Sequence, residues 1–125
     1  MQPAIWSQYK NFKKEEFNCK HTGKNEMKHE FMLVLQKLRD AYGKPIVITS
    51  GFRDKTHPVE RNKTTTGTHV QGIACDIRIN DGSDLYELVE LALQIGFTGL
   101  GIGNRTGHKM LHLDIRKTTP VIWSY

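Results

Sequence analysis

Residues 73–79 read IACDIRI, and residues 110–116 read MLHLDIR. In both segments an aliphatic or cysteine side chain occupies every second position, which is the period of a strand with one buried face. If the two strands share a sheet whose aliphatic face packs on helices, Asp76, His112 and Asp114 all project from the opposite face. The two segments therefore predict a cleft lined by groups that can bind a metal ion.

Helical patterns lie next to these strands along the chain. Residues 27–42 carry apolar side chains at helical spacing, with Asn25 as the expected N-cap and Gly43 as the stop signal. A second helix is expected with Ser83 or Asp84 as its N-cap and Gly96 as its stop signal. We therefore expect a small α+β domain whose helices cover one face of an antiparallel sheet.

The remaining segments are short or irregular. Residues 46–49 are β-branched and predict a short strand, whereas residues 52–67 are polar and predict a long exposed loop. A loop of that length inside a compact domain is usually functional. The glycine-rich residues 99–103 lie outside the predicted strands. Cys75 shares the aliphatic face of its strand and is expected in the core.

Length and composition limit the classes of protein. The 125 residues correspond to a single domain, 1–125, and 18 Lys and Arg against 13 Asp and Glu give a net charge of +5. Positive charge favours polyanionic partners such as nucleic acid, an anionic membrane surface or the bacterial wall. The longest apolar runs, about five residues, are too short to span a membrane. Two cysteines exclude a disulfide framework and indicate a reducing compartment of synthesis.

A candidate metal site follows from the loop before the first strand. This loop contributes His69, and Gly72 allows the backbone to turn from the loop into the strand that carries Asp76. A zinc ion could be held by two imidazoles and one carboxylate, from His69, His112 and Asp76. Three protein ligands leave the fourth position of a tetrahedral zinc ion open for water, which is the arrangement of catalytic zinc sites. The alternative is that Asp76 simply pairs with a neighbouring arginine such as Arg78.

Three motifs in this order resemble those of the zinc D-Ala-D-Ala carboxypeptidase family. They are SGFR at 50–53, HVQGIACD at 69–76 and HLD at 112–114 with Trp123 beyond it, and residues 12–19 also resemble the opening of its small single-domain branch. The resemblance covers nearly the whole chain. It implies an α+β fold related to these carboxypeptidases and to the hedgehog signalling domain, with the zinc site on the sheet face opposite the helices.

Residue by residue, the resemblance implies that His69, Asp76 and His112 hold one Zn²⁺ ion. It also implies that Arg53 lies near the carbonyl or carboxylate of the substrate, where its planar, permanently charged fork suits either group. The structural alternative for Arg53 is a salt bridge to Asp54 or Glu60 that holds the long loop in place.

Two positions depart from the family pattern. Gly67 stands where many members have serine, and Lys109 stands where several members have an acid three residues before the last ligand. The catalytic base is therefore expected at Asp114 or, second, at His108, because strand alternation can place both on the face of His112. The other interpretation of Asp114 is a carboxylate that orients the imidazole of a ligand.

The resemblance implies a zinc metallopeptidase that hydrolyses a peptide bond in the stem or crosslink peptides of bacterial peptidoglycan. The size, the positive charge and an N-terminus without an apolar signal segment resemble a bacteriophage endolysin, made in the host cytoplasm and acting on the cell wall during lysis. We expect a monomer that neither binds nucleic acid nor inserts into a membrane. The alternatives are a non-catalytic module of the same fold that holds zinc and binds the wall, and a metal-dependent nuclease.

Overall fold

The strands of the computed structural model form one mixed sheet. The structure describes residues 1–105 and 108–125, with Arg105 and His108 described by their backbone alone. In this part of the chain five strands pair in the order β1-β2-β4-β3-β5. Their bounds are Ile48–Ser50 for β1, Ala74–Ile79 for β2, Gly99–Arg105 for β3, His108–Asp114 for β4 and Val121–Ser124 for β5. Strands β1, β2, β4 and β3 are antiparallel neighbours, but β5 runs parallel to β3. The expectation of a wholly antiparallel sheet is therefore wrong at β5.

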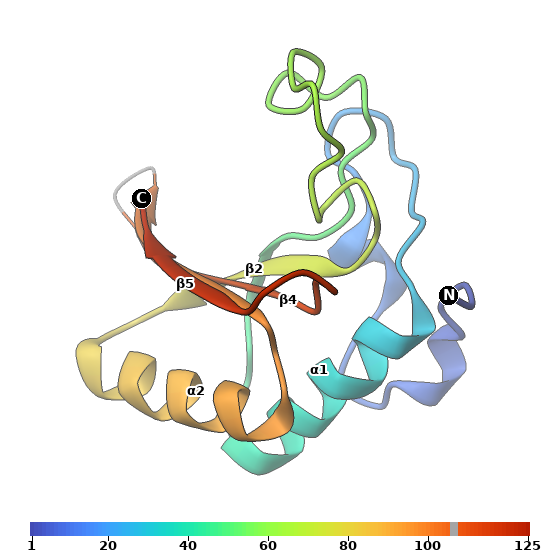
Figure 1. Cartoon of the computed structure of the whole chain (residues 1–125). Coiled ribbons are helices and arrows are strands. Elements are labelled where there is room, and N and C mark those ends of the chain that lie inside the picture. The colour runs from blue at the N-terminus through green and yellow to red at the C-terminus, as the bar shows by residue number, and fades with distance from the viewer. Residues whose placement is uncertain (106–107) are drawn as a thin grey trace.

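Two α-helices, α1 (His29–Tyr42) and α2 (Gly82–Ile95), lie beneath one face of the sheet, and the long loop rises above the other (Figure 1). The remaining helical elements are two short 3₁₀ turns, η1 (Trp6–Gln8) and η2 (Lys14–Phe17). This arrangement confirms the predicted α+β class with helices on one face. None of the described helices has the length and apolar character needed to cross a membrane.

The core lies between the helices and the aliphatic face of the sheet. The predicted alternation is confirmed, because Cys75, Ile77, Leu111 and Leu113 are all fully buried. They meet apolar side chains from one face of α1, such as Phe31, in a single apolar cluster. Burial of this face fixes the register of β2 and β4, since a shift by one residue would expose every core side chain.

Both helices begin at positions other than the predicted ones. α1 starts at His29, because the Asn25 side chain accepts a hydrogen bond from the Met27 backbone N–H at 3.0 Å and so stabilises a turn before the helix. α2 is capped by Asp81 rather than by residues 83–84, with the Asp81 carboxylate accepting from the backbone N–H of Asp84 at 2.8 Å. The predicted stop signals at both helix ends are confirmed.

Strands β3 and β5 were not expected from the sequence. The glycines of β3 face side chains that leave no room for a Cβ atom. At Gly99 a Cβ would lie 2.2 Å from the Asp114 carboxylate, and at Gly101 it would lie 2.7 Å from the Trp123 ring. Glycine normally weakens a strand, but here it lets neighbouring side chains lie flat on the sheet.

Candidate metal centre and cleft

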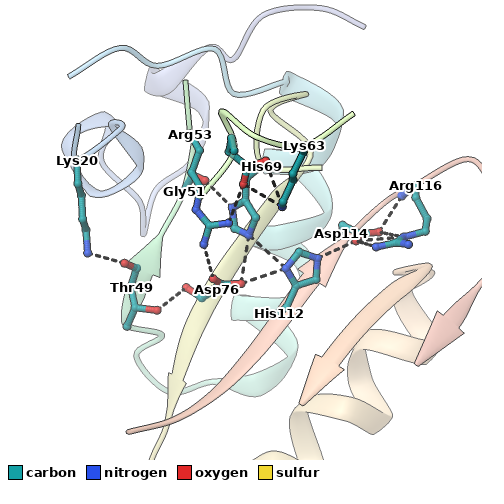
Figure 2. A network of polar contacts seen from close by, with 11 residues as sticks. Lys20, Thr49, Gly51, Arg53, Lys63, His69, Asp76, His112, Asp114 and Arg116 are labelled. Carbon is teal, nitrogen blue, oxygen red and sulfur yellow. Dashed lines mark hydrogen bonds and ion pairs between the residues drawn. The ribbon is translucent and has the colours of Figure 1, made fainter. Parts of the chain in front are cut away.

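The three predicted zinc ligands come together on the sheet face opposite the helices. Asp76 on β2 and His112 on β4 are partners in the antiparallel register, and His69 reaches them from the long loop (Figure 2). One donor atom from each residue lies within 4.8 Å of the other two. All three side chains are buried, with Asp76 and His112 on neighbouring strands and His69 beside them.

The donor atoms are mutually close and point at one another. Nδ1 of His112 lies 3.0 Å from Oδ1 of Asp76, and Nε2 of His69 lies 3.3 Å from the same oxygen. The two imidazole nitrogens are 3.2 Å apart. Two nitrogens and one carboxylate oxygen at this spacing are the donor set that zinc prefers in catalytic sites.

The other nitrogen of each imidazole is held by the protein. Nδ1 of His69 lies 2.7 Å from the carbonyl oxygen of Gly51, and Nε2 of His112 lies 2.7 Å from Oδ2 of Asp114. Since a carbonyl oxygen only accepts hydrogen bonds, Nδ1 of His69 donates and its Nε2 keeps a free lone pair. Such outer contacts fix the tautomer and the ring orientation of metal-binding histidines. The cluster therefore fits a metal ion.

Local backbone features place His69 in this position. Gly72 has a φ of 74°, and a Cβ there would lie 2.0 Å from the carbonyl oxygen of Glu26. A Cβ at Gly51 would lie 2.5 Å from the backbone of Phe17. Both glycines therefore bring loop segments closer to the N-terminal region than any other residue could. This explains the glycines of the SGFR and HVQGIACD motifs in physical terms.

Burial and hydrogen bonding shift the pKa values of the cluster in different directions. Burial lowers the pKa of His69 below its ordinary value. Burial also disfavours the charged form of His112, but hydrogen bonds to Asp114 and Asp76 outweigh it and raise the pKa of His112. Burial opposes ionisation of Asp76, yet hydrogen bonds from both histidines hold its pKa well below the usual range. Asp76 is therefore a carboxylate at neutral pH.

Arg53 links the cluster to the long loop. Its Nη2 lies 3.3 Å from Oδ2 of Asp76, and its Nη1 lies 3.2 Å from Oε2 of Glu60. Asp76 therefore does pair with an arginine, as the sequence alternative supposed, but the partner is Arg53 rather than Arg78. The salt bridge to Glu60 expected under the structural interpretation of Arg53 is also present, so this arginine supports both the loop and the cluster.

Glu60 is the most unusual polar residue of the loop. Its side chain is only 2% exposed, and its Oε1 receives no hydrogen bond from any described residue, although Lys63 Nζ lies 3.3 Å away. Burial raises the pKa of Glu60, but Lys63 and Arg53 outweigh this and lower it below its ordinary value. From the sequence, Glu60 is expected only as a possible partner of Arg53, because the burial of one residue in a polar loop has no local sequence pattern.

Asp114 lies on the predicted face of β4 but on the far side of the His112 ring from the donor atoms. It is fully buried, and Arg116 donates to both of its oxygens, at 2.6 Å from Nη2 to Oδ2 and 3.0 Å from Nε to Oδ1. These contacts favour the interpretation of Asp114 as a residue that orients His112. The side chain of the second base candidate, His108, lies outside the described residues.

The cluster lies at the wall of an open cleft of about 750 Å³. His69, His112 and Arg53 line it, together with Trp123 from β5, whose ring centre is 5.1 Å from that of His112. The sequence resemblance includes Trp123, but its place beside His112 was not predicted, because β5 was not expected. A buried donor set that opens into a cleft allows a substrate to approach a bound metal ion.

An α+β domain with a His–Asp–His donor set at the wall of an open cleft has the construction of a single-metal hydrolase. A family model described as Peptidase M15 matches residues 10–114, and the chain belongs to this family. The protein is therefore a metallopeptidase of a zinc-dependent family that acts on peptidoglycan peptides. The match confirms the resemblance to zinc D-Ala-D-Ala carboxypeptidases. Comparison with curated proteins returns no match.

Proposed function

We propose that the protein hydrolyses peptide bonds in bacterial peptidoglycan with one zinc ion held by His69 Nε2, His112 Nδ1 and an oxygen of Asp76. The observation that supports this most strongly is the pair of outer contacts on the imidazoles, from Gly51 and Asp114. They leave the two inner nitrogens directed at the same carboxylate oxygen. Such a layout serves metal binding better than core stability, because buried polar groups are expensive to desolvate.

When bound, zinc supplies a water whose pKa is lowered to about 7 and polarises the scissile carbonyl. The residues of the chain supply orientation and charge. Asp114 holds His112 by its Nε2, and Arg116 holds Asp114 in turn. Arg53 places a permanent positive charge beside Asp76, where it stabilises negative charge that develops on a substrate carbonyl oxygen.

In this proposal Asp114 acts through His112 and does not take up a proton from the reaction. His108 then stays the predicted proton acceptor, as the second candidate that the period of two in the sequence offers. Lys109, the residue in the position of the usual acid, is exposed and lines a hollow beside Asp76, but a lysine is a poor substitute for a carboxylate base.

The proposed biological setting is lysis of a bacterium by a bacteriophage endolysin that works as a monomer. The resemblance of the chain and its net charge of +5, which suits a polyanionic wall, support this setting. We expect the purified protein to clear bacteria whose outer barriers have been permeabilised, and to leave intact cells unchanged.

A turbidity assay on purified peptidoglycan tests the proposed activity. We expect the zinc-loaded protein to clear the suspension, and a chelator or the His69→Ala variant to abolish clearing. A pull-down on the same material runs beside it. Binding to the wall without any clearing by zinc-loaded protein would contradict the peptidase and favour the non-catalytic wall-binding module.

A further inference from the structure

A further cavity lies beside the metal centre. A second hollow, of about 560 Å³, lies against Asp76 and is lined by Thr49 and Ser50 of β1, by Lys20 and by Arg78. Arg53 lines both hollows. Figure 2 shows Lys20 and Thr49 on one side of the His69–Asp76–His112 cluster and Arg116 on the other. The donor cluster therefore lies between two hollows, because His69 and His112 line the first, Asp76 lines the second, and Arg53 lines both.

Both hollows are lined by positive charge. The first contains Lys28 and Lys117, and the second contains Arg78, and none of these three side chains forms an ion pair with a described residue. Each hollow has a single carboxylate side chain in its lining, Glu60 in the first and Asp76 in the second. Both carboxylates are already paired with Arg53, so the unpaired charge on each side is positive.

Arg53 is not placed as a clamp for a free peptide end. An enzyme that removes a terminal residue needs a cation that grips the terminal carboxylate, and the two-pronged contact of arginine is the strongest form of that grip. Here Nη1 already donates to Glu60 and Nη2 to Asp76, and the side chain is about 90% buried. Arg53 lines both hollows, and both of its Nη atoms are already engaged by protein carboxylates.

We infer that the substrate runs through both hollows, so that the enzyme cuts an internal bond of an acidic peptide with carboxylates on both sides of the scissile amide. This inference rests on the proposed function and deepens it. One water is consumed, the amide C–N bond breaks, and the products are a new carboxylate end and a new amino end. Each product keeps at least two residues, in contrast to the single amino acid that a carboxypeptidase releases.

The test is the identity of the products released by the zinc-loaded protein from purified peptidoglycan, read by mass spectrometry and by free amino acid analysis. We expect new amino ends and peptide fragments of two or more residues, and no release of a single amino acid. Release of single amino acids alone would overturn the internal cut while leaving a peptidase. Absence of any hydrolysis would contradict the proposed function itself, and the inference with it.

Charge reversal on each side tests the two hollows separately. Lys117 in the first hollow and Arg78 in the second both have exposed side chains, so we change each of them to glutamate. Lys37→Glu on α1 makes the same charge change at an exposed position outside both hollows. We expect KM on a soluble acidic wall peptide to rise roughly five-fold or more in each of the first two variants, with kcat little changed. The Lys37→Glu control should stay within about two-fold. An Arg78→Glu variant that behaves like this control would overturn the inference.

Discussion

Both faces of β2 and β4 carry buried side chains, but different forces hold the two faces. On the helix face Leu111 and Leu113 are fully buried among apolar neighbours, where contact is non-directional. On the cleft face His112 is 3% exposed and Asp114 is fully buried, and each polar atom has a specific partner. The helix face should therefore determine stability, and the cleft face should determine metal affinity and activity.

The largest effect should come from neighbouring truncations on β4. His112→Ala removes one of three donor atoms, so we expect loss of stoichiometric zinc and a fall in hydrolysis of about 1000-fold or more. Leu111→Ala should lower the free energy of unfolding by about 2–5 kcal/mol and keep zinc while folded. Metal analysis and urea unfolding of both variants measure the contrast. Loss of zinc from folded Leu111→Ala protein would contradict the proposed difference between the two faces.

A second large effect is expected at Arg53, which contacts both the loop and the cluster. Arg53→Lys keeps the charge but cannot bridge Glu60 and Asp76 together, so turnover should fall by about 10- to 100-fold and zinc should be retained. Steady-state kinetics at saturating zinc and a melting curve measure both properties. Normal turnover with a lowered melting temperature would assign Arg53 a purely structural role.

Asp114→Asn separates the orientation of a ligand from proton transfer. As an orienting residue, Asp114 should contribute about 10- to 100-fold to zinc affinity, with near-normal turnover once zinc is saturating. As a base, it should instead cost about 100-fold or more in turnover at any zinc concentration. Zinc titration followed by kinetics at saturation distinguishes the two roles, and a persistent rate loss would contradict the orienting role.

Gly99→Ala should reproduce part of the Asp114→Asn result without touching a polar group. The added methyl would overlap the Asp114 carboxylate, whose nearest oxygen is 2.2 Å from the Cβ position, and should shift it away from His112. We expect zinc affinity to fall by about 10-fold. Gly82→Ala at the start of α2 is the matched control, because a Cβ there meets nothing within 4 Å. Equal zinc affinity in both variants would count against the displacement of Asp114.

The smallest effect concerns Glu60 and depends on pH. The folded-state pKa of Glu60 is lowered, so its contribution is present above the unfolded pKa of about 4.3 and is lost as pH falls through the folded value. Glu60→Gln should lower the free energy of unfolding by about 1–2 kcal/mol at pH 7. The difference from wild type should shrink below about pH 4. Urea unfolding in chelator from pH 7 to pH 3 measures it, and a difference independent of pH would exclude the charge of Glu60 as its source.

Much of the fold could be predicted because β2 and β4 carry a local signal, the alternation that buries Cys75 and Leu111 on one face. Strand β3 could not be predicted, since three of its seven residues are glycines, which are rare inside strands. Strand β5, which pairs with β3, was not predicted either. The reason for glycine at Gly101 is the ring of Trp123, which comes from a distant part of the chain. Sequence patterns cannot show contacts of this kind.

In the candidate site too, some features could be predicted from the sequence and others could not. Alternation places Asp76, His112 and Asp114 on one face, and the structure has them there. Alternation does not show which nitrogen of His112 meets Asp114, so the sequence left the role of Asp114 open between base and orienting residue. The double pairing of Arg53 was likewise open, because it depends on how the long loop folds over the sheet.

We propose that the cleft face holds zinc through three specific atoms. Anomalous diffraction at the zinc edge from crystals of the zinc-loaded protein locates the ion. We expect one peak per chain at about 2.0–2.2 Å from Nε2 of His69, Nδ1 of His112 and an oxygen of Asp76. A peak bound instead through Nε2 of His112, or a peak away from these residues, would contradict it.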